Sequence, residues 1–214
     1  MYPKIQFKEP QFDTLYTAPE TLGERKVSIL EAAHEILAKE GYQGFTMRRV
    51  AHQAQMHLKT LQHYFSTKKD LLIGVLRYSI LKKYKEFWET LIRRQSENPR
   101  DIFQLAIDYL INDAKDPLTS RFFPELWALS TRDPDAADAM EELYALYRSI
   151  MDKLIRVLNP TLPEQSVARR AVAIIAMIEG MTLFIGPHNM SRPAELQNIE
   201  EEVVSAALQI VFMP

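Results

Sequence analysis

The spacing of the prolines is the feature of this sequence that most constrains its fold. No proline lies between Pro19 and Pro99, whereas prolines divide the second half at intervals that suit helices of a few turns each. Sustained alternation of apolar and polar residues is missing, as are the Asn-Gly and Asp-Gly pairs typical of β-hairpins. The sequence therefore predicts an all-α fold.

Apolar residues near the N-terminus recur at helical intervals and predict three successive helices. The first ends at Gly41, a residue type that often ends helices. A second, short helix begins after Thr46, a favoured N-cap, and a third follows the turn at Ala54–Met56. The apolar face of the first helix comprises Val27, Ile29, Leu30, Ala33, Ile36 and Leu37. Two short helices joined by a tight turn behind a longer helix predict a helix-turn-helix.

A set of segments in one continuous register resembles the TetR (tetracycline-repressor) family. The segments are Ile29–Ala33, Gly41–Ala51, Ala54, Thr60–Leu61, Tyr64–Phe65 and Lys68–Leu72. The resemblance implies an N-terminal three-helix helix-turn-helix head joined by a long helix to a six-helix body for ligand binding and dimerisation. It also implies a repressor that binds palindromic operator DNA as a dimer and is released by a small-molecule effector, although some relatives are activators or need a corepressor.

The resemblance divides the chain into an N-terminal arm (1–22), a DNA-binding domain (23–69) and a ligand-binding and dimerisation domain (70–214). The helix that opens the last part is expected to be the lever between head and body. The arm carries Lys4 and Lys8, which suit an approach to DNA, and packing on the body or disorder are the alternatives. Helices of the last domain are expected at about 70–96, 101–115, 118–131, 135–158, 163–186 and 195–212.

Three positions of the helix-turn-helix depart from the family's habit. Gln55 stands in the turn and Lys59 in the third helix, where the family usually or often has glycine, and Gln62 replaces a usual tyrosine. If Gln55 adopts the left-handed conformation that glycine supplies, it costs on the order of 1 kcal/mol. Lys59 is able to reach a phosphate or a guanine edge, and Gln62 suits a bidentate contact to adenine. The operator is therefore expected to be atypical.

Positive charge is concentrated in the same part of the chain. Between Gly41 and Lys83, eight Lys or Arg residues accompany a single acid, Asp70, so this segment carries +7 in a chain whose net charge is −2. Such a segment favours a polyanion as partner, and a solvated basic face is the alternative.

The predicted DNA-binding residues fall into two groups. Those near the helix ends are expected to meet phosphates, and core packing beside Phe65 is the alternative for Tyr64. Those on or beside the third helix are expected to meet base edges, and simple surface placement is the alternative for the two histidines. The first group is Thr46, Arg48, Tyr64 and Lys68, and Arg49 is a further candidate DNA-binding residue assigned to neither group. The second group is His57, Lys59, Thr60, Gln62 and His63.

The last two predicted helices are apolar on nearly every side. Such helices must be buried, and a second copy of the chain is an economical way to bury them in a small domain. A homodimer through these helices is therefore expected, with a purely intramolecular core as the alternative.

Aromatic and methionine residues on the middle helices suit the walls of an apolar ligand pocket. Each of them taken alone is more often a core residue than a pocket residue. Glu179 is the most informative, because an ionisable group within an apolar helix must be paired, protonated or facing a cavity, and it suits a cationic or hydroxylated ligand. The candidate ligand-binding residues are Phe103, Ile107, Leu110, Phe122, Phe123, Leu126, Trp127, Tyr144, Tyr147, Met151, Met177, Glu179, Met181 and Phe184.

Catalysis, cofactors and metals are not expected. There is no cysteine, nucleophile elbow, phosphate loop or dinucleotide fingerprint. Glu31 and His34 match the spacing of a di-iron ligand pair, but no second copy of that pair is present. The N-terminus lacks a signal peptide and no apolar stretch reaches the length of a membrane span, so a cytoplasmic location is expected. The alternative function is a helical protein-interaction module with a degenerate DNA-binding head.

Overall fold

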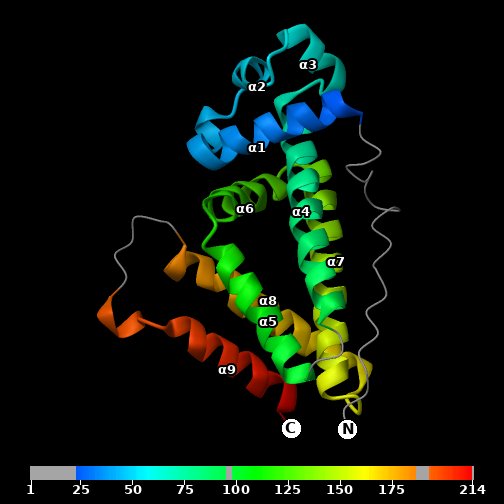
Figure 1. Cartoon of the computed structure of the whole chain (residues 1–214), viewed down its shortest axis with the longest axis vertical. Helices are drawn as coiled ribbons and strands as arrows, with labels where there is room; N and C mark the ends of the chain where they lie inside the picture. The colour runs from blue at the N-terminus through cyan, green and yellow to red at the C-terminus, as the bar shows by residue number, and fades with distance from the viewer. Residues whose placement is uncertain (1–22, 95–97, 187–192, 214) are drawn as a thin grey trace. The chain divides into compact units, whose positions relative to one another are not determined.

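The computed structural model describes residues 23–94, 98–186 and 193–213 (Figure 1). Every regular element among them is helical, which confirms the predicted all-α fold. The predicted arm, 1–22, and the side chain of Phe122 lie outside the described residues, as do the side chains of 80–84. The elements are α1 (Glu24–Gly44), α2 (Met47–Gln53), α3 (Leu58–Tyr64), α4 (Lys68–Arg93), α5 (Pro99–Ala114), α6 (Pro117–Ser130), α7 (Pro134–Leu158), α8 (Glu164–Ile185), the 3₁₀ helix η3 (Ala194–Leu196) and α9 (Ile199–Phe212).

The described residues form two compact units. The head unit contains α1, α2, α3, α4 as far as Glu86, α6, and α7 as far as Leu143. The body unit contains the rest of α4 from Phe87, α5, the rest of α7 from Tyr144, α8, η3 and α9. The two long helices α4 and α7 therefore each contribute to both units.

The head unit is built on a core that α1 shares with elements far along the chain. Ile29, Leu30 and Leu37 are buried on the face of α1 that the apolar spacing predicts. Helix α6 packs against α1, and Leu126 of α6 is fully buried in the same core. Three residues of α7, Ala136, Ala139 and Leu143, complete this side of the core. Helices expected to belong to the ligand-binding domain therefore pack with the DNA-binding helices, because the apolar face of α1 is wider than α2 and α3 cover.

Helix starts and stops follow the residue types that the sequence places there. Gly41 interrupts α1 with a φ of 65°, as expected of a glycine stop, although the helical turn resumes to Gly44. Thr46 is the N-cap of α2, and its Oγ1 accepts a hydrogen bond from the Arg49 N–H at 3.3 Å. Asn98 caps α5 in the same way, with Pro99 at the first helical position.

The body unit pairs α5 with both α8 and α9. Helix α8 matches the predicted range, but the last helix begins later than predicted. Asn198 takes a left-handed conformation, with a φ of 60°, and separates η3 from α9. Despite the apolar character of α8, none of the described helices combines the length and hydropathy that crossing a bilayer requires.

Candidate functional site

The turn between α2 and α3 is a Schellman motif, a common way to end a helix. The N–H of Met56 donates to the carbonyl of Ala51 at 2.9 Å, and the N–H of Gln55 donates to that of His52 at 3.0 Å. Gln55 is left-handed, with a φ of 51°, as expected if it takes over the role of glycine. The motif orients α3 relative to α2, so the turn holds its geometry without the glycine.

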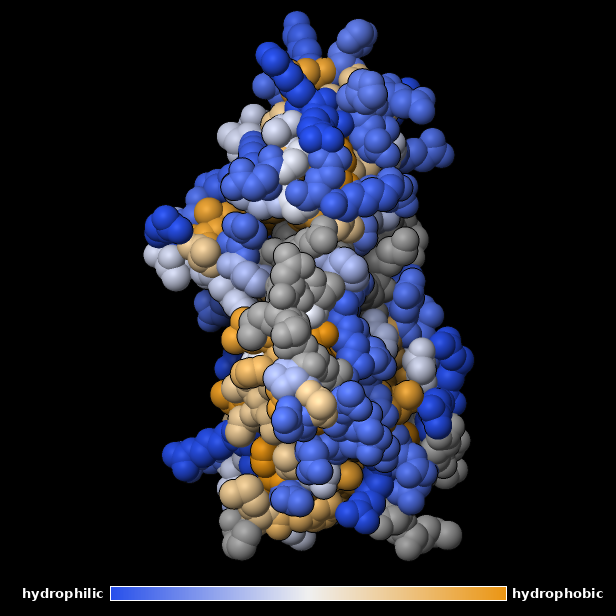
Figure 2. All heavy atoms as spheres, turned by 90° about the vertical axis from the view of Figure 1, so that its left-hand side faces the viewer, coloured by the Kyte–Doolittle hydropathy of each residue, from blue (hydrophilic) through white to orange (hydrophobic). Residues whose placement is uncertain are grey.

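One buried residue anchors α3 while its other faces remain open to solvent. Leu61 is 0% exposed in the head core, next to the equally buried Phe45 and Val50. The predicted base-contacting residues are all exposed, and Figure 2 shows a mainly hydrophilic surface over this end of the head unit. These exposed residues, which we call the α3 row, are His57, Lys59, Thr60, Gln62 and His63. The α3 row therefore combines hydrogen-bond donors and acceptors on a helix that the core holds in place.

Three of the predicted phosphate-contacting residues, Thr46, Arg48 and Tyr64, are exposed near the ends of α2 and α3. Thr46 and Arg48 are exposed at the start of α2, where the helix N-terminus favours an anion. Tyr64 is 39% exposed and meets His63 edge to face, whereas Phe65 is buried. The aromatic pair therefore divides between surface and core, which favours the surface role for Tyr64 over core packing.

Lys68 is folded back onto the head. Its Nζ donates to the carbonyl oxygen of Tyr42 at 3.2 Å and lies 3.6 Å from the centre of the Tyr42 ring. Partial burial lowers the pKa of Lys68, and the negative charge of Glu125 opposes that effect. These contacts give Lys68 a structural role in joining α4 to the end of α1.

The basic segment is less uniform than its sequence indicates. Arg49 forms an ion pair with Glu40, Lys69 with two aspartates of the α6–α7 corner, and Arg77 with Glu142. Within the described part of the chain, Arg48 and Lys59 are the cations of this segment with no internal partner. The positive charge available to a polyanion is therefore focused on α2 and α3.

The predicted ligand-binding residues are divided between the two units. In the head unit, Leu126 belongs to the core that contains α1, and Phe123 packs against that core. Trp127 is half-buried beside Phe123. Phe184 and its neighbour Leu183 are exposed on α8, at 53% and 56%. Half-buried members in the body unit are Tyr144, Met177 and Glu179. Buried members in the body unit are Phe103, Ile107, Leu110, Tyr147, Met151 and Met181.

Glu179 is an ionisable residue of the body unit with a strongly perturbed environment. Burial raises the pKa of Glu179 to about 7, a hydrogen bond with Tyr144 opposes the rise, and the negative charge of Asp113 adds to it. The Tyr144 ring stacks on that of Tyr147, with 6.3 Å between ring centres. Helices α5, α7 and α8 thus bring two acids and two tyrosine rings together, as the sequence could not specify.

Sequence reasoning missed the acidic partners of Lys69 at the start of α7. Asp133 and Asp135 flank Pro134, a pattern typical of a helix N-terminus, but nothing in the sequence indicates which cation they meet. The structure places both carboxylates within ion-pair distance of Lys69.

Comparison with known families matches both parts of the chain. Residues 29–75 match the family described as bacterial regulatory proteins of the tetR family, and residues 99–208 match the BetI-type transcriptional repressor C-terminal domain. The chain is 25% identical over 191 residues to an uncharacterized HTH-type transcriptional regulator in the dhlA 5′ region of Xanthobacter autotrophicus, covering 85% of this chain and 87% of that protein. It is 24% identical over 192 residues to the HTH-type transcriptional regulator BetI of Rhizobium meliloti, covering 86% and 90%.

Solved structures share the fold. A putative transcriptional regulator from Saccharomonospora viridis, in complex with choline, superposes with a TM-score of 0.69 at 18% identity, covering 88% of this chain and 96% of that one. At that identity the likeness concerns the fold alone. The two family matches, in register with the helix-turn-helix and with the helices from α5 to α9, carry the assignment. The chain therefore belongs to the TetR family of ligand-responsive transcriptional regulators, with a regulatory domain of the BetI type.

Proposed function

We propose that this protein is a repressor that binds palindromic operator DNA through the α3 row and leaves it when a small molecule binds the body unit. The observation that carries the proposal is the α3 row itself, five exposed polar side chains on a helix anchored by the buried Leu61. Lys59 and Gln62 are the side chains of the row suited to bidentate or charged contacts with base edges. Arg48, with no partner among the described residues, would bind phosphate and set the register. We expect such a protein to work in the cytoplasm, where its DNA is.

Footprinting and fluorescence anisotropy on DNA from upstream of the protein's own gene test the proposal. A protected palindrome should appear, and its affinity should fall with salt with a slope of about −0.9 per phosphate contacted. Equal affinity for all DNA sequences, or no binding at low salt, would instead favour the interaction module with a degenerate head.

The dimer is proposed to form through the outward face of α8 together with the end of α9. Val172, Leu183 and Phe184 are 49%, 56% and 53% exposed, far more than large apolar side chains normally are. Small residues separate them, and a Cβ added at Gly180 would meet nothing within 4 Å. This face, which we call the α8 stripe, consists of Ala168, Val172, Ala173, Ala176, Gly180, Leu183 and Phe184. Figure 2 shows apolar side chains gathered on the side of the body unit formed by α8 and α9, where Phe212 is also exposed.

A second copy is the proposed occupant because two half-sites of a palindrome require a two-fold protein. Small residues along the α8 stripe would allow two helices to approach closely. Sedimentation velocity tests the dimer directly, and a monomer at micromolar concentration would contradict it.

The effector is proposed to be a small organic cation held near Glu179. A carboxylate beside two tyrosine rings suits a cation, which would keep Glu179 ionised and lie against the ring faces. The choline complex of the structural relative from Saccharomonospora viridis supports this class of ligand.

Thermal shift with choline and with its uncharged carbon analogue, 3,3-dimethylbutanol, separates charge from shape. A ligand stabilises the state it binds, so choline alone should raise the melting temperature, and Glu179→Gln should abolish the rise. Equal shifts with both compounds would contradict the role of the carboxylate.

A further inference from the structure

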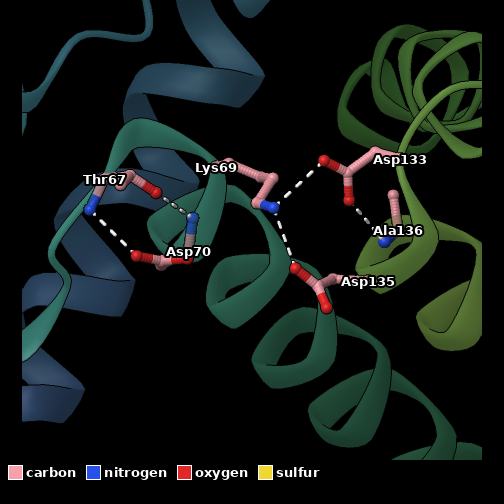
Figure 3. Close-up of polar contacts among 6 residues, drawn as sticks. All are labelled: Thr67, Lys69, Asp70, Asp133, Asp135 and Ala136. Carbon is pink, nitrogen blue, oxygen red and sulfur yellow. Dashed lines mark hydrogen bonds and ion pairs between the residues drawn. The ribbon is translucent and has the colours of Figure 1, made fainter.

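An ion-pair cluster ties the start of α4 to the start of α7 within the head unit (Figure 3). The Nζ of Lys69 lies 2.8 Å from Oδ2 of Asp135 and 3.1 Å from Oδ2 of Asp133. The side chain of Asp133 is only 18% exposed and that of Lys69 36%. A hydrogen bond from Lys69 lowers the pKa of Asp133, against the effect of partial burial. The Lys69–Asp133 contact is therefore more sheltered than an ordinary surface ion pair, and solvent screens it less. The Asp135 side chain is 66% exposed, so its contact with Lys69 is a surface ion pair.

Both ends of this cluster are held rigidly by their own helices. At the start of α4, the N–H of Thr67 donates to Oδ2 of Asp70 at 2.9 Å, and the N–H of Asp70 donates to Oγ1 of Thr67 at 3.0 Å. This reciprocal pair is a capping box. At the start of α7, Oδ1 of Asp133 accepts the N–H of Ala136 at 3.1 Å while Oδ2 faces Lys69. The Lys69 contacts therefore join two capped helix ends rather than two mobile side chains.

A second ion pair joins the same two helices, and we call the two sets of contacts together the α4–α7 seam. Arg77 lies two turns after Lys69 on α4, and its Nη2 is 3.1 and 3.3 Å from the two carboxylate oxygens of Glu142, two turns along α7. Since both contacts advance in the same direction, the two helices run parallel here, with charged ties at both places. A shift of α7 relative to α4 would strain both ties.

The seam lies close to α3 along the chain. Only Phe65, Ser66 and Thr67 separate the end of α3 from the start of α4, and Phe65 is buried in the head core. The position of the first turn of α4 therefore sets the position of α3. Helix α7 runs on beyond Leu143 into the body unit, where Tyr144 faces Glu179. The seam thus joins α4 to α7, the two long helices that each continue from the head unit into the body unit.

We propose that Lys69, Asp133 and Asp135 form a latch that positions α3 for the operator, and that these three are positioning residues for DNA binding. The inference rests on the proposed operator binding. A head held by the latch loses less freedom when two recognition helices dock in successive major grooves, so the latch raises operator affinity. Displacement of α7 would open the latch and lower that affinity.

Charge-removing variants test the latch, because the latch and direct electrostatics predict opposite changes in operator affinity. Asp133→Asn keeps the cap, since asparagine caps helices as well as aspartate. The double variant D133N/D135N removes two negative charges from a DNA-binding protein, which by charge alone should strengthen binding. The latch predicts the opposite, a loss of roughly three- to tenfold in operator affinity, close to the loss from Lys69→Gln. Lys39→Gln is the matched control, because Lys39 pairs with Glu35 within α1 and should change affinity less than twofold.

Two further measurements make each outcome decisive. If Lys69 simply contacts phosphate, K69Q will lower the salt slope by about 0.9 and D133N/D135N will bind as tightly as the wild type or tighter, which overturns the latch. The charge-reversed triple variant K69E/D133N/D135K restores one ion pair and should regain part of the affinity that K69E loses.

Hydrogen exchange without DNA separates this inference from the proposed function. The latch predicts faster exchange of the amides at the starts of both α4 and α7 in D133N/D135N, and unchanged exchange in K39Q. Unchanged exchange in D133N/D135N would refute the latch even if operator binding is normal. Faster exchange in a protein that binds no operator would leave the latch in place and refute the proposed function.

Discussion

The outward faces of α3 and α8 are both exposed, but their chemistry is opposite. The α3 row presents a cation, an amide, a hydroxyl and two imidazoles, whereas the α8 stripe presents alanines, a glycine and three large apolar side chains. Each helix is anchored on its other side by fully buried residues, Leu61 in α3 and Ile174 in α8.

This difference shows what each face is suited to meet. The polar side chains of the α3 row form hydrogen bonds with water when they are exposed, so exposure costs little. DNA can replace those hydrogen bonds with equivalent ones from its bases and phosphates. An exposed apolar stripe is costly until another apolar surface covers it. The α3 row therefore suits DNA, and the α8 stripe suits a second copy of the chain.

The largest expected effect comes from placing a charge in the α8 stripe. In Leu183→Asp, dimerisation would bury an unpaired carboxylate, which costs roughly 3–5 kcal/mol, so the variant should sediment as a monomer. Operator affinity should fall by roughly 100-fold or more, because one half-site contact alone remains. Gln104→Asp, at an exposed position of α5, is the control and should remain dimeric. A dimeric L183D would move the interface away from the α8 stripe.

The pH dependence of stability tests the protonation of Glu179, which lies on the inner side of α8. The folded pKa of Glu179, about 7, lies above its ordinary value of 4.5, so the folded state binds the proton more tightly. Its contribution to stability is full below pH 4.5 and is lost as the pH rises to 7. Glu179→Gln should therefore be more stable than the wild type at pH 8 by roughly 2–3 kcal/mol.

Urea unfolding at pH 5 and pH 8 measures this difference, which should fall to about a quarter of its pH 8 value at pH 5. A constant difference between the two proteins at both pH values would show that Glu179 is not protonated in the folded state at pH 5.

Within the α3 row, Lys59→Gln should cost about 1–2 kcal/mol of operator binding and relax the preference for one base pair. Anisotropy with the operator and with single-base variants would detect both changes. Lys39→Gln removes the same charge from α1 and provides the comparison, since it should affect all DNA alike and weakly. Equal losses on every sequence in Lys59→Gln would assign Lys59 to phosphate instead.

The smallest expected effect concerns the turn that orients the α3 row. Gln55→Gly removes the cost of a left-handed glutamine and should stabilise the protein by about 0.5–1 kcal/mol. Gln43→Gly, at a helical position of α1, should instead destabilise it by a similar amount. Thermal unfolding would measure both, and destabilisation by Gln55→Gly would mean that the Gln55 side chain makes a compensating contact.

Most of the fold and the exposure of the candidate DNA-binding residues were predictable from the sequence. Helix ranges, the cap at Thr46 and the left-handed turn at Gln55 depend on residues within one or two turns of each other. The exposure of the α3 row follows from helical periodicity once Leu61 is assigned to the core. By contrast, the late start of α9 depends on the conformation of Asn198, which its neighbours do not dictate.

The sequence by itself determined the all-α fold, the helix-turn-helix and the residues that α3 exposes, because periodicity and capping are local. Only the tertiary structure decided which cations remain available to DNA. Lys69 and Asp135 are 66 residues apart, and no pattern along the chain indicates that they meet. It likewise decided that Leu126 joins the head core, because the pairing of α6 with α1 depends on the apolar surface that each leaves uncovered.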